Sequence, residues 1–250
     1  IIKCVVDCIN QTPFQAYYRK QPHGEWVTNW QQRLEAYFWP NPQVGYNETK
    51  SWVDQLMVKM VPLVSARLDK QSWSNDQFQE AKAFTEEIFR WGGVSASIQN
   101  ISDETVQSVI DSAIFGKKMN DAPMNSAWTK LAAFSSLCCP PEFHQAIWDS
   151  RVSHSLISRI DECFGRRDVA QLFNMQLGWV PGRGGNRKAL PEYSVRWPRG
   201  YRSWASHFEA ASILREITGI LNLSPATYGR LDGDAWSVRD VEMVLFMDGY

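Results

Sequence analysis

The feature that most constrains the fold is the spacing of apolar residues, which recurs every three or four positions along most of the chain. This period puts apolar side chains on one face of a helix, whereas a half-buried strand shows strict alternation. The segment from Trp26 to Phe38 follows the helical period and ends before Pro40. We find no convincing alternating run and no internal repeat. The sequence therefore predicts an all-α protein.

Capping residues predict where the helices begin. Ser74, followed three positions later by Gln77, has the spacing of a capping box, in which each residue satisfies a free backbone amide of the other. Pro62 lies within a further apolar pattern and is expected to break or kink that helix. Helix starts are predicted at Asn47, Ser74, Ser102, Asn125 or Ser126, Asp149, Ser224 and Ser237.

The length of 250 residues suits one large domain or two small ones packed together. We expect two helical lobes around a cleft. Three segments are distinguished: residues 1–100, a helical region of unknown relation; residues 101–165, which carry the candidate chemistry; and residues 166–250, with a basic loop and the C-terminal helices. The loop spans 177–200 and is rich in glycine, proline and cations, a composition typical of functional or mobile loops.

The charge is unevenly distributed. The whole chain has a net charge of −1, but the window from Arg151 to Arg215 holds eleven Lys and Arg against five acids, a net charge of +6. Ten of those cations are arginines, which suit bidentate phosphate contacts. The window is either a solvated basic face or a phosphate-binding face on a protein that acids elsewhere keep soluble.

The five cysteines indicate reduced thiols and a cytoplasmic location. Cys138 and Cys139 are neighbours that are not expected to pair, and no Cys/His spacing indicates a metal site. The opening run IIKCVVDCI is short and carries Lys3 and Asp7, so we expect neither a signal peptide nor a membrane-spanning helix from it. We expect no metal, no cofactor and no membrane partner.

Lys130 and Asp149 are the candidate catalytic pair. They lie nineteen residues apart, Lys130 in the first turns of one expected helix and Asp149 at the start of the next. An amine nucleophile and a carboxylate on adjoining helices are the minimum equipment for Schiff-base chemistry. The alternatives are a surface lysine on an amphipathic helix and a plain N-cap, the latter worth ~1 kcal/mol.

Residues 101–160 resemble the helix-hairpin-helix DNA glycosylase superfamily, and within it the 8-oxoguanine glycosylase-like lyases of a divergent bacterial type. MNSAWTK stands where that family has its hairpin and catalytic Lys, and IWDSRV where it has the helix-capping Asp. The resemblance implies a helix, a short turn and a second helix between Ile101 and Phe134. The family's hairpin glycines are replaced here by Met124, Asn125, Ser126 and Ala127, and Arg151 stands where a His is common.

The resemblance implies roles for the pair and its neighbours. Lys130 would attack the sugar C1′ of a flipped nucleotide, and Asp149 would stabilise the positive charge that develops on the sugar. The residues expected to contact DNA or line a base pocket are Asn125, Ser126, Trp128, Trp148, Arg151, His154, Arg199 and Arg202. The twelve tryptophans are mainly expected in the core, with a few lining a pocket that stacks on a flat ligand.

The leading hypothesis is a DNA N-glycosylase, with β-lyase activity as a further expectation, that excises an oxidised or modified base from double-stranded or locally opened DNA. The first alternative is a catalytically degenerate glycosylase-fold module that binds nucleic acid or a partner protein. Because relatives of this divergent type also occur beside anti-phage signalling systems, that partner could be a defence-system protein. The second alternative is an enzyme acting on a free nucleoside or nucleotide.

Overall fold

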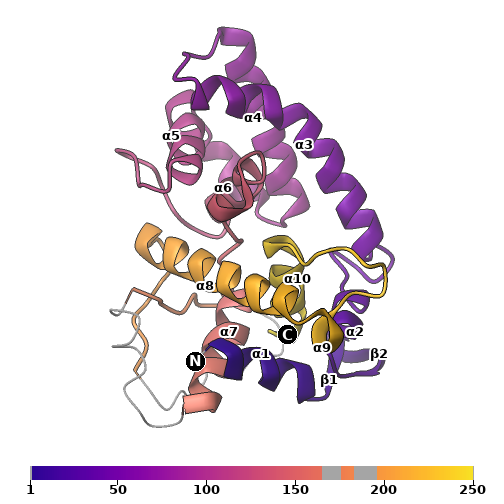
Figure 1. Cartoon of the computed structure of the whole chain (residues 1–250). Helices are drawn as coiled ribbons and strands as arrows, with labels where there is room; N and C mark the ends of the chain where they lie inside the picture. The colour runs from indigo at the N-terminus through magenta and orange to yellow at the C-terminus, as the bar shows by residue number, and fades with distance from the viewer. Residues whose placement is uncertain (1, 165–175, 183–195, 250) are drawn as a thin grey trace.

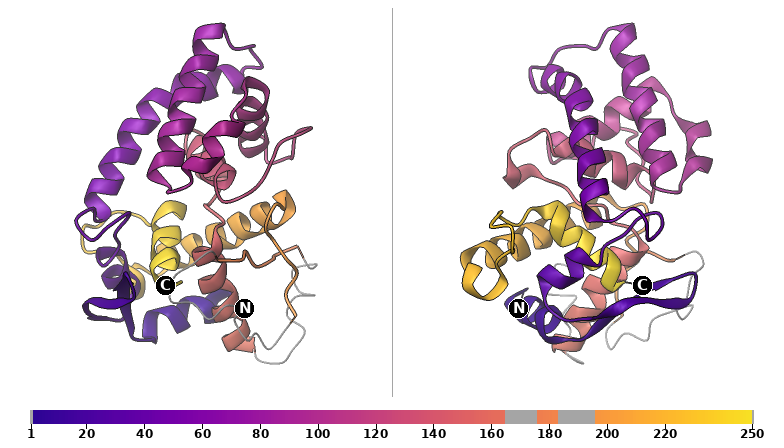
Figure 2. Two further views of the ribbon diagram at one scale, coloured as in Figure 1. Left: turned by 180° about the vertical axis from the view of Figure 1, so that it is seen from behind. Right: turned by 90° about the vertical axis from the view of Figure 1, so that its right-hand side faces the viewer.

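The computed structural model describes residues 2–164, 176–182 and 196–249. In this part of the chain the structure is mainly helical, which confirms the predicted class, with one small antiparallel sheet as the exception. Figure 1 shows two lobes, one above the other, and both chain ends lie in the lower lobe. The lobes remain separate in the views of Figure 2. Within the described residues, no helix is long and apolar enough to cross a membrane.

The lower lobe is built from the two ends of the described chain. Its core brings together apolar side chains from the first helix and from the last three long helices, among them Ile9, Ile157, Leu214 and Val244, all fully buried. Its elements are α1 (Ile2–Gln11), β1 (Phe14–Tyr18), β2 (Gln21–Val27), α2 (Trp30–Glu35), α7 (Ser150–Phe164), α8 (Trp204–Leu223), α9 (Pro225–Tyr228) and α10 (Val238–Asp248).

The upper lobe is built from the middle of the chain and has a core of its own. Leu56, Phe84, Ile110 and Leu131 are buried together there, one from each of its four main helices. The elements are α3 (Tyr46–Leu68), α4 (Asn75–Trp91), η1 (Ser95–Asn100), α5 (Asp103–Ile114) and α6 (Trp128–Ser136), followed by η2 (Pro141–Phe143). The chain therefore leaves the lower lobe through α3 and returns to it before α7.

Most of the expected helix starts are confirmed. Ser74 accepts a hydrogen bond from the backbone of Gln77 and the capping box is complete, and a second box joins Ser237 to Asp240. Ser102 caps α5 in the same way. These starts were predictable because a cap depends on residues three positions apart in the sequence.

The long helix α3 departs from the sequence prediction in two ways. Its N-cap is Gly45, whose amide donates to the Glu48 carboxylate, and not Asn47. Pro62 lies inside the helix, which continues to Leu68. A proline inside a helix removes one backbone hydrogen bond and crowds the carbonyl four residues earlier, and packing of neighbouring residues such as Leu63 in the core opposes this cost.

The region near the N-terminus contains a β-hairpin where the sequence predicted only helices. Trp26 and Val27 belong to β2, and the expected helix shortens to α2. Strands β1 and β2 pair with Ala16 opposite His23, and the turn uses Arg19 and Lys20 with positive φ. Because β2 is almost wholly exposed, it carries no alternating apolar pattern that could have revealed it.

The link between α5 and α6 runs from 115 to 127 and is longer than the short turn expected between these two helices. The two helices nevertheless pack side by side in the upper lobe. The sequence also predicts a short helix from Asp168 to Met175, and those residues lie outside the described part of the chain.

Candidate functional site

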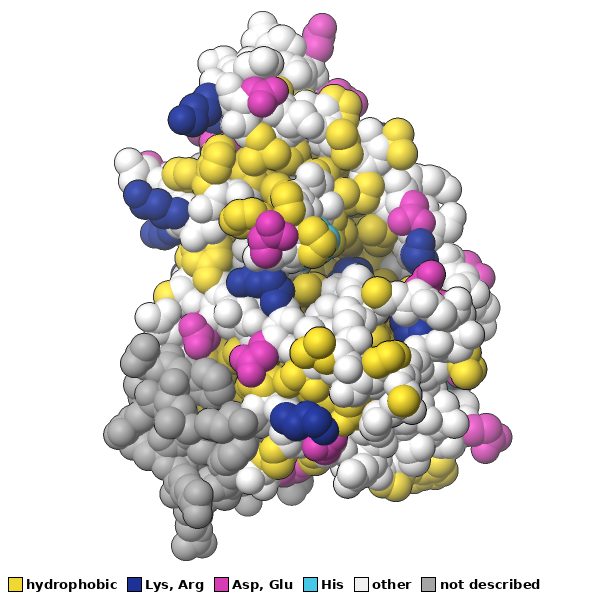
Figure 3. All heavy atoms as spheres, viewed as in Figure 1, with side chains coloured by type: hydrophobic (Ala, Val, Ile, Leu, Met, Phe, Trp, Pro, Cys, Tyr) yellow, Lys and Arg dark blue, Asp and Glu magenta, His cyan; other side chains and the backbone are white. Residues whose placement is uncertain are grey.

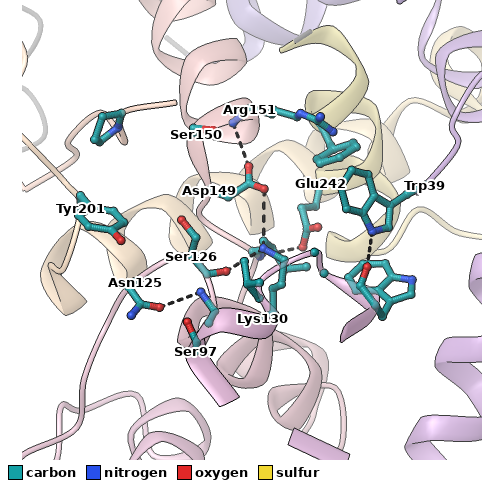
Figure 4. Close-up of a pocket in the computed structure, with 18 of the residues that line it drawn as sticks. Trp39, Ser97, Asn125, Ser126, Lys130, Asp149, Ser150, Arg151, Tyr201 and Glu242 are labelled. Carbon is teal, nitrogen blue, oxygen red and sulfur yellow. Dashed lines mark hydrogen bonds and ion pairs between the residues drawn. The ribbon is translucent and has the colours of Figure 1, made fainter. Parts of the chain in front are cut away.

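A pocket of about 530 Å³ lies where the two lobes meet. Its walls come from the loop after α2, the end of α4, the starts of α6 and α7, and one face of α10. Figure 4 shows the Lys130 amine and the Asp149 carboxylate pointing toward one another in it. The volume falls in the range of small-ligand sites. The expected cleft therefore exists, and the candidate pair shares it.

Lys130 is a buried residue, not a surface lysine. Its side chain is 7% exposed, and Nζ donates a hydrogen bond to the Ser126 carbonyl oxygen at 2.7 Å. The Asp149 Oδ2 atom lies 4.0 Å from Nζ. That separation is longer than a direct hydrogen bond, so the carboxylate acts on the amine by charge and not by a fixed contact.

The surroundings of Lys130 favour its neutral form. Burial lowers the pKa of the Lys130 amine, and the nearby positive charges of Arg239 and Arg151 lower it further, whereas the Asp149 carboxylate raises it. The net direction is downward from the ordinary value of 10.5. A lowered pKa increases the neutral fraction, which is the nucleophilic form of an amine.

Asp149 caps α7, as the sequence predicted. Its Oδ1 atom accepts hydrogen bonds from the amides of Arg151 at 2.9 Å and Val152 at 3.2 Å. Those contacts leave Oδ2 as the oxygen nearer to Lys130. The cap fixes the carboxylate at the first turn of α7.

Asn125 and Ser126 line the pocket just before α6, but neither is the predicted N-cap, since that position is Ala127. The Asn125 Oδ1 atom accepts from the amides of Ala127 at 2.8 Å and Trp128 at 3.2 Å. Ser126 contributes its carbonyl oxygen to Lys130. Both residues therefore lie at the site, where the Asn125 side chain and the Ser126 carbonyl make local hydrogen bonds.

Arg151 and Arg199 also line the pocket. The Arg151 guanidinium lies over the rings of Phe246, at 4.4 Å from the centroid, and Trp39, at 5.1 Å. Trp39 itself is held by a 2.7 Å hydrogen bond from its indole nitrogen to the Trp91 carbonyl. A cation stacked on aromatic rings stays planar and oriented, which suits contact with a flat or anionic ligand.

Four residues expected at the site lie elsewhere. Trp128 packs in the upper core with its ring 5.0 Å from that of Phe89, and the Trp148 indole donates to the Gly178 carbonyl in the lower core. The bulk of these rings explains their burial. His154 lies on α7, with its Nδ1 atom 3.4 Å from the hydroxyl of Ser158 on the next turn. None of these lines the pocket, and neither does Arg202.

Two charged residues of the pocket were missed by the sequence reasoning. Arg239 and Glu242 form an ion pair on α10, and both are almost fully buried. The Arg239 guanidinium lies between the rings of Trp91 and Phe134, and burial lowers its pKa. In sequence, an Arg and a Glu three apart on a short helix indicate a solvated pair, so only the tertiary fold reveals the burial.

Two arginines of the arginine-rich window are engaged in contacts within the protein. Arg159 is paired with Asp248 at 2.8 Å, and Arg215 donates to the His144 carbonyl. On the face drawn in Figure 3, the visible Lys and Arg side chains are scattered and do not form one continuous patch. Arg166, Arg167, Arg183, Arg187 and Lys188 lie outside the described residues. Within the part of the chain that the structure describes, no three His, Cys, Asp or Glu residues form a group able to hold a metal ion.

No known protein family, curated protein or solved structure matches this chain.

Proposed function

We propose that this protein is a DNA N-glycosylase with β-lyase activity, acting on an oxidised or otherwise modified base. One observation carries the proposal: a buried amine with a lowered pKa, Lys130, faces a carboxylate, Asp149, in a pocket between two helical lobes. Keeping a buried amine charged is costly when its carboxylate neighbour lies 4.0 Å away, beyond hydrogen-bond reach, so the presence of Lys130 in a pocket favours a chemical role.

The chemistry assigns a separate task to each member of the pair. Lys130 Nζ forms a bond to the sugar C1′ as the bond from C1′ to the base breaks, and the base leaves with the electron pair and takes up a proton. Asp149 stabilises the positive charge on the sugar during that exchange. Ring opening then gives a Schiff base on Lys130, and loss of the proton at C2′ eliminates the 3′ phosphate.

The walls of the pocket support a nucleotide as the ligand. The volume of about 530 Å³ suits one flipped nucleotide, and the aromatic residues Trp39, Trp91 and Phe246 are part of the pocket wall. Arg151 and Arg199 at the same pocket add positive charge for flanking phosphates. The two-lobed arrangement is also what the resemblance to the helix-hairpin-helix glycosylases implies.

Borohydride trapping tests the proposal. The protein is incubated with duplexes that carry either an abasic site or 8-oxoguanine, and reduction fixes any Schiff base as a covalent adduct. We expect an adduct with the native protein and none with Lys130→Gln. Lys50→Gln is the matched control, because Lys50 also lies beside an aspartate, Asp54, but on the exposed surface.

The outcomes separate the three hypotheses. DNA binding without an adduct on either duplex contradicts the proposal and favours a degenerate binding module. Absence of DNA binding, together with a nucleoside or nucleotide that raises the melting temperature, favours action on a free ligand.

A further inference from the structure

The segment that leads into Asp149 has no regular secondary structure, yet it is fully buried between the lobes. Its backbone amides are satisfied by side chains. Ile147 donates to the Glu242 carboxylate at 2.8 Å, and Trp148 donates to the Thr129 hydroxyl at 2.7 Å. The position of Asp149 therefore depends on side chains from α6 and α10 and not on a sheet or helix ladder.

Thr129 is the neighbour of Lys130 and is fully buried. Its hydroxyl joins three parts of the fold: it accepts from the Trp148 amide, it lies 3.4 Å from the Ala146 carbonyl, and it lies 3.1 Å from His207 Nδ1 on α8. One oxygen thus connects the helix of the nucleophile to the segment of the carboxylate and to the lower lobe.

The hydrogen-bond roles at Thr129 follow from its single proton. If His207 Nδ1 carries the imidazole proton and donates to Oγ1, the hydroxyl proton remains for the Ala146 carbonyl. That tautomer leaves a lone pair, and not an N–H, at His207 Nε2, for which no described group is within hydrogen-bond reach. An orphan buried N–H is the costlier defect, so this arrangement is the stable one. Burial also lowers the pKa of His207 to about 3, which keeps the ring neutral.

We infer that Thr129, supported by His207, is a positioning residue that sets the distance between Lys130 and Asp149. This inference rests on the proposed function for its catalytic meaning. Without the hydroxyl, the Trp148 amide loses its acceptor, and the backbone before Asp149 gains freedom to move. A displacement of about 1 Å between reacting groups can reduce a rate by about 100-fold.

The test compares Thr129→Val, which keeps the shape but removes the hydroxyl, with Thr129→Ser, which keeps the hydroxyl. Thr85→Val is the control, because Thr85 is equally buried and its hydroxyl bonds only to the Ala81 carbonyl within its own helix. We expect Thr129→Val to slow adduct formation at saturating abasic duplex by about 10- to 100-fold. The duplex dissociation constant should stay within about threefold, and Thr129→Ser should restore the rate.

Two readouts do not require activity. Hydrogen exchange at the Trp148 amide should accelerate in Thr129→Val alone. The pH midpoint for reductive methylation of Lys130, followed by mass spectrometry, should fall in Thr129→Val, because Asp149 raises the pKa of that amine. If the native protein forms no adduct, the proposed function fails and these two readouts decide the positioning role. An unchanged or raised midpoint, or an equal rate loss in Thr85→Val, overturns it.

Discussion

Gly92 lies directly against the side chain of Lys130. A Cβ atom on Gly92 would come within 2.4 Å of Lys130 Cδ and 2.5 Å of Cε. Gly92, the C-cap residue of α4, therefore leaves the space through which the Lys130 side chain reaches the pocket. The backbone at Gly92 is helical, with φ of −75°, so the requirement for glycine there comes from this contact and not from backbone conformation.

Gly92→Ala should consequently displace Lys130 while leaving the helix end intact. We expect adduct formation on abasic duplex to slow by about 10-fold or more, since the amine must shift relative to Asp149. Gly219→Ala is the control, because a Cβ atom there meets nothing within 4 Å on the helix α8. That variant should keep full activity and gain up to about 1 kcal/mol of stability. Equal activity in both variants would contradict the view that Gly92 makes room for the Lys130 side chain.

Substitutions at Asp149 should separate its cap from its charge. Asp149→Ala removes both, so we expect a loss of about 1 kcal/mol in the free energy of unfolding as well as a loss of activity. Asp149→Asn retains an oxygen for the amides of Arg151 and Val152 and should keep most of the stability. Urea denaturation and trapping rates measure the two effects. A fully active Asn variant would show that the carboxylate charge has no catalytic role.

The pH dependence of Lys130 reactivity should report its environment. Because burial lowers the pKa of the amine, the labelling rate should rise with pH and reach half its maximum below the ordinary value of 10.5. The Asp149 charge raises that pKa, so Asp149→Asn should move the midpoint to still lower pH. Quantitative mass spectrometry of the Lys130 peptide checks both statements. A midpoint at 10.5 in the native protein would mean that the amine is solvated.

Removing the charge of Asp248 should lower the free energy of unfolding strongly. It is 2% exposed and pairs with two arginines, Arg33 of α2 and Arg159 of α7. Asp248→Ala leaves both cations without that carboxylate, and we expect a cost of about 3–5 kcal/mol in the free energy of unfolding. The exposed pair of Lys50 and Asp54 offers the comparison, since Asp54→Ala should cost less than about 1 kcal/mol.

Acid titration provides an independent check on Asp248. Burial alone would raise the pKa of this carboxyl, but the hydrogen bond from Arg159 and the charge of Arg33 outweigh burial and lower it below 3.8. Because the pKa of Asp248 is lower in the folded protein than in the unfolded chain, the carboxylate stabilises the fold fully above pH 3.8. This stabilisation is lost as the pH falls through the pKa of the folded state. The native protein should therefore lose stability over that acidic range more steeply than Asp248→Asn.

The sequence predicted the local features well. Helix caps at Ser74, Ser102 and Asp149 depend on residues three or fewer positions apart, and the structure confirms them. Lys130 and Asp149 lie near the starts of adjoining helices, and the segment 137–149 between those helices returns along α6 to bring the two side chains into one pocket.

Features that depend on tertiary packing were not predictable. Glu242 reaches the segment before Asp149 from nearly a hundred residues away, and Gly92 makes room for Lys130 from a different helix. No pattern in one sequence links such positions. Trp128 and Trp148 were expected at the pocket because they lie close to Lys130 and Asp149 in sequence. Neighbours in sequence can point in different directions, and these two rings enter the cores of the lobes.

The central claim is that Lys130 carries the covalent intermediate. The most direct measurement is peptide mapping by mass spectrometry of the borohydride-reduced adduct between the native protein and an abasic duplex. The mass of the reduced sugar fragment should lie on Lys130. An adduct on another lysine or on the N-terminal amine, or no adduct at any pH tested, would contradict it.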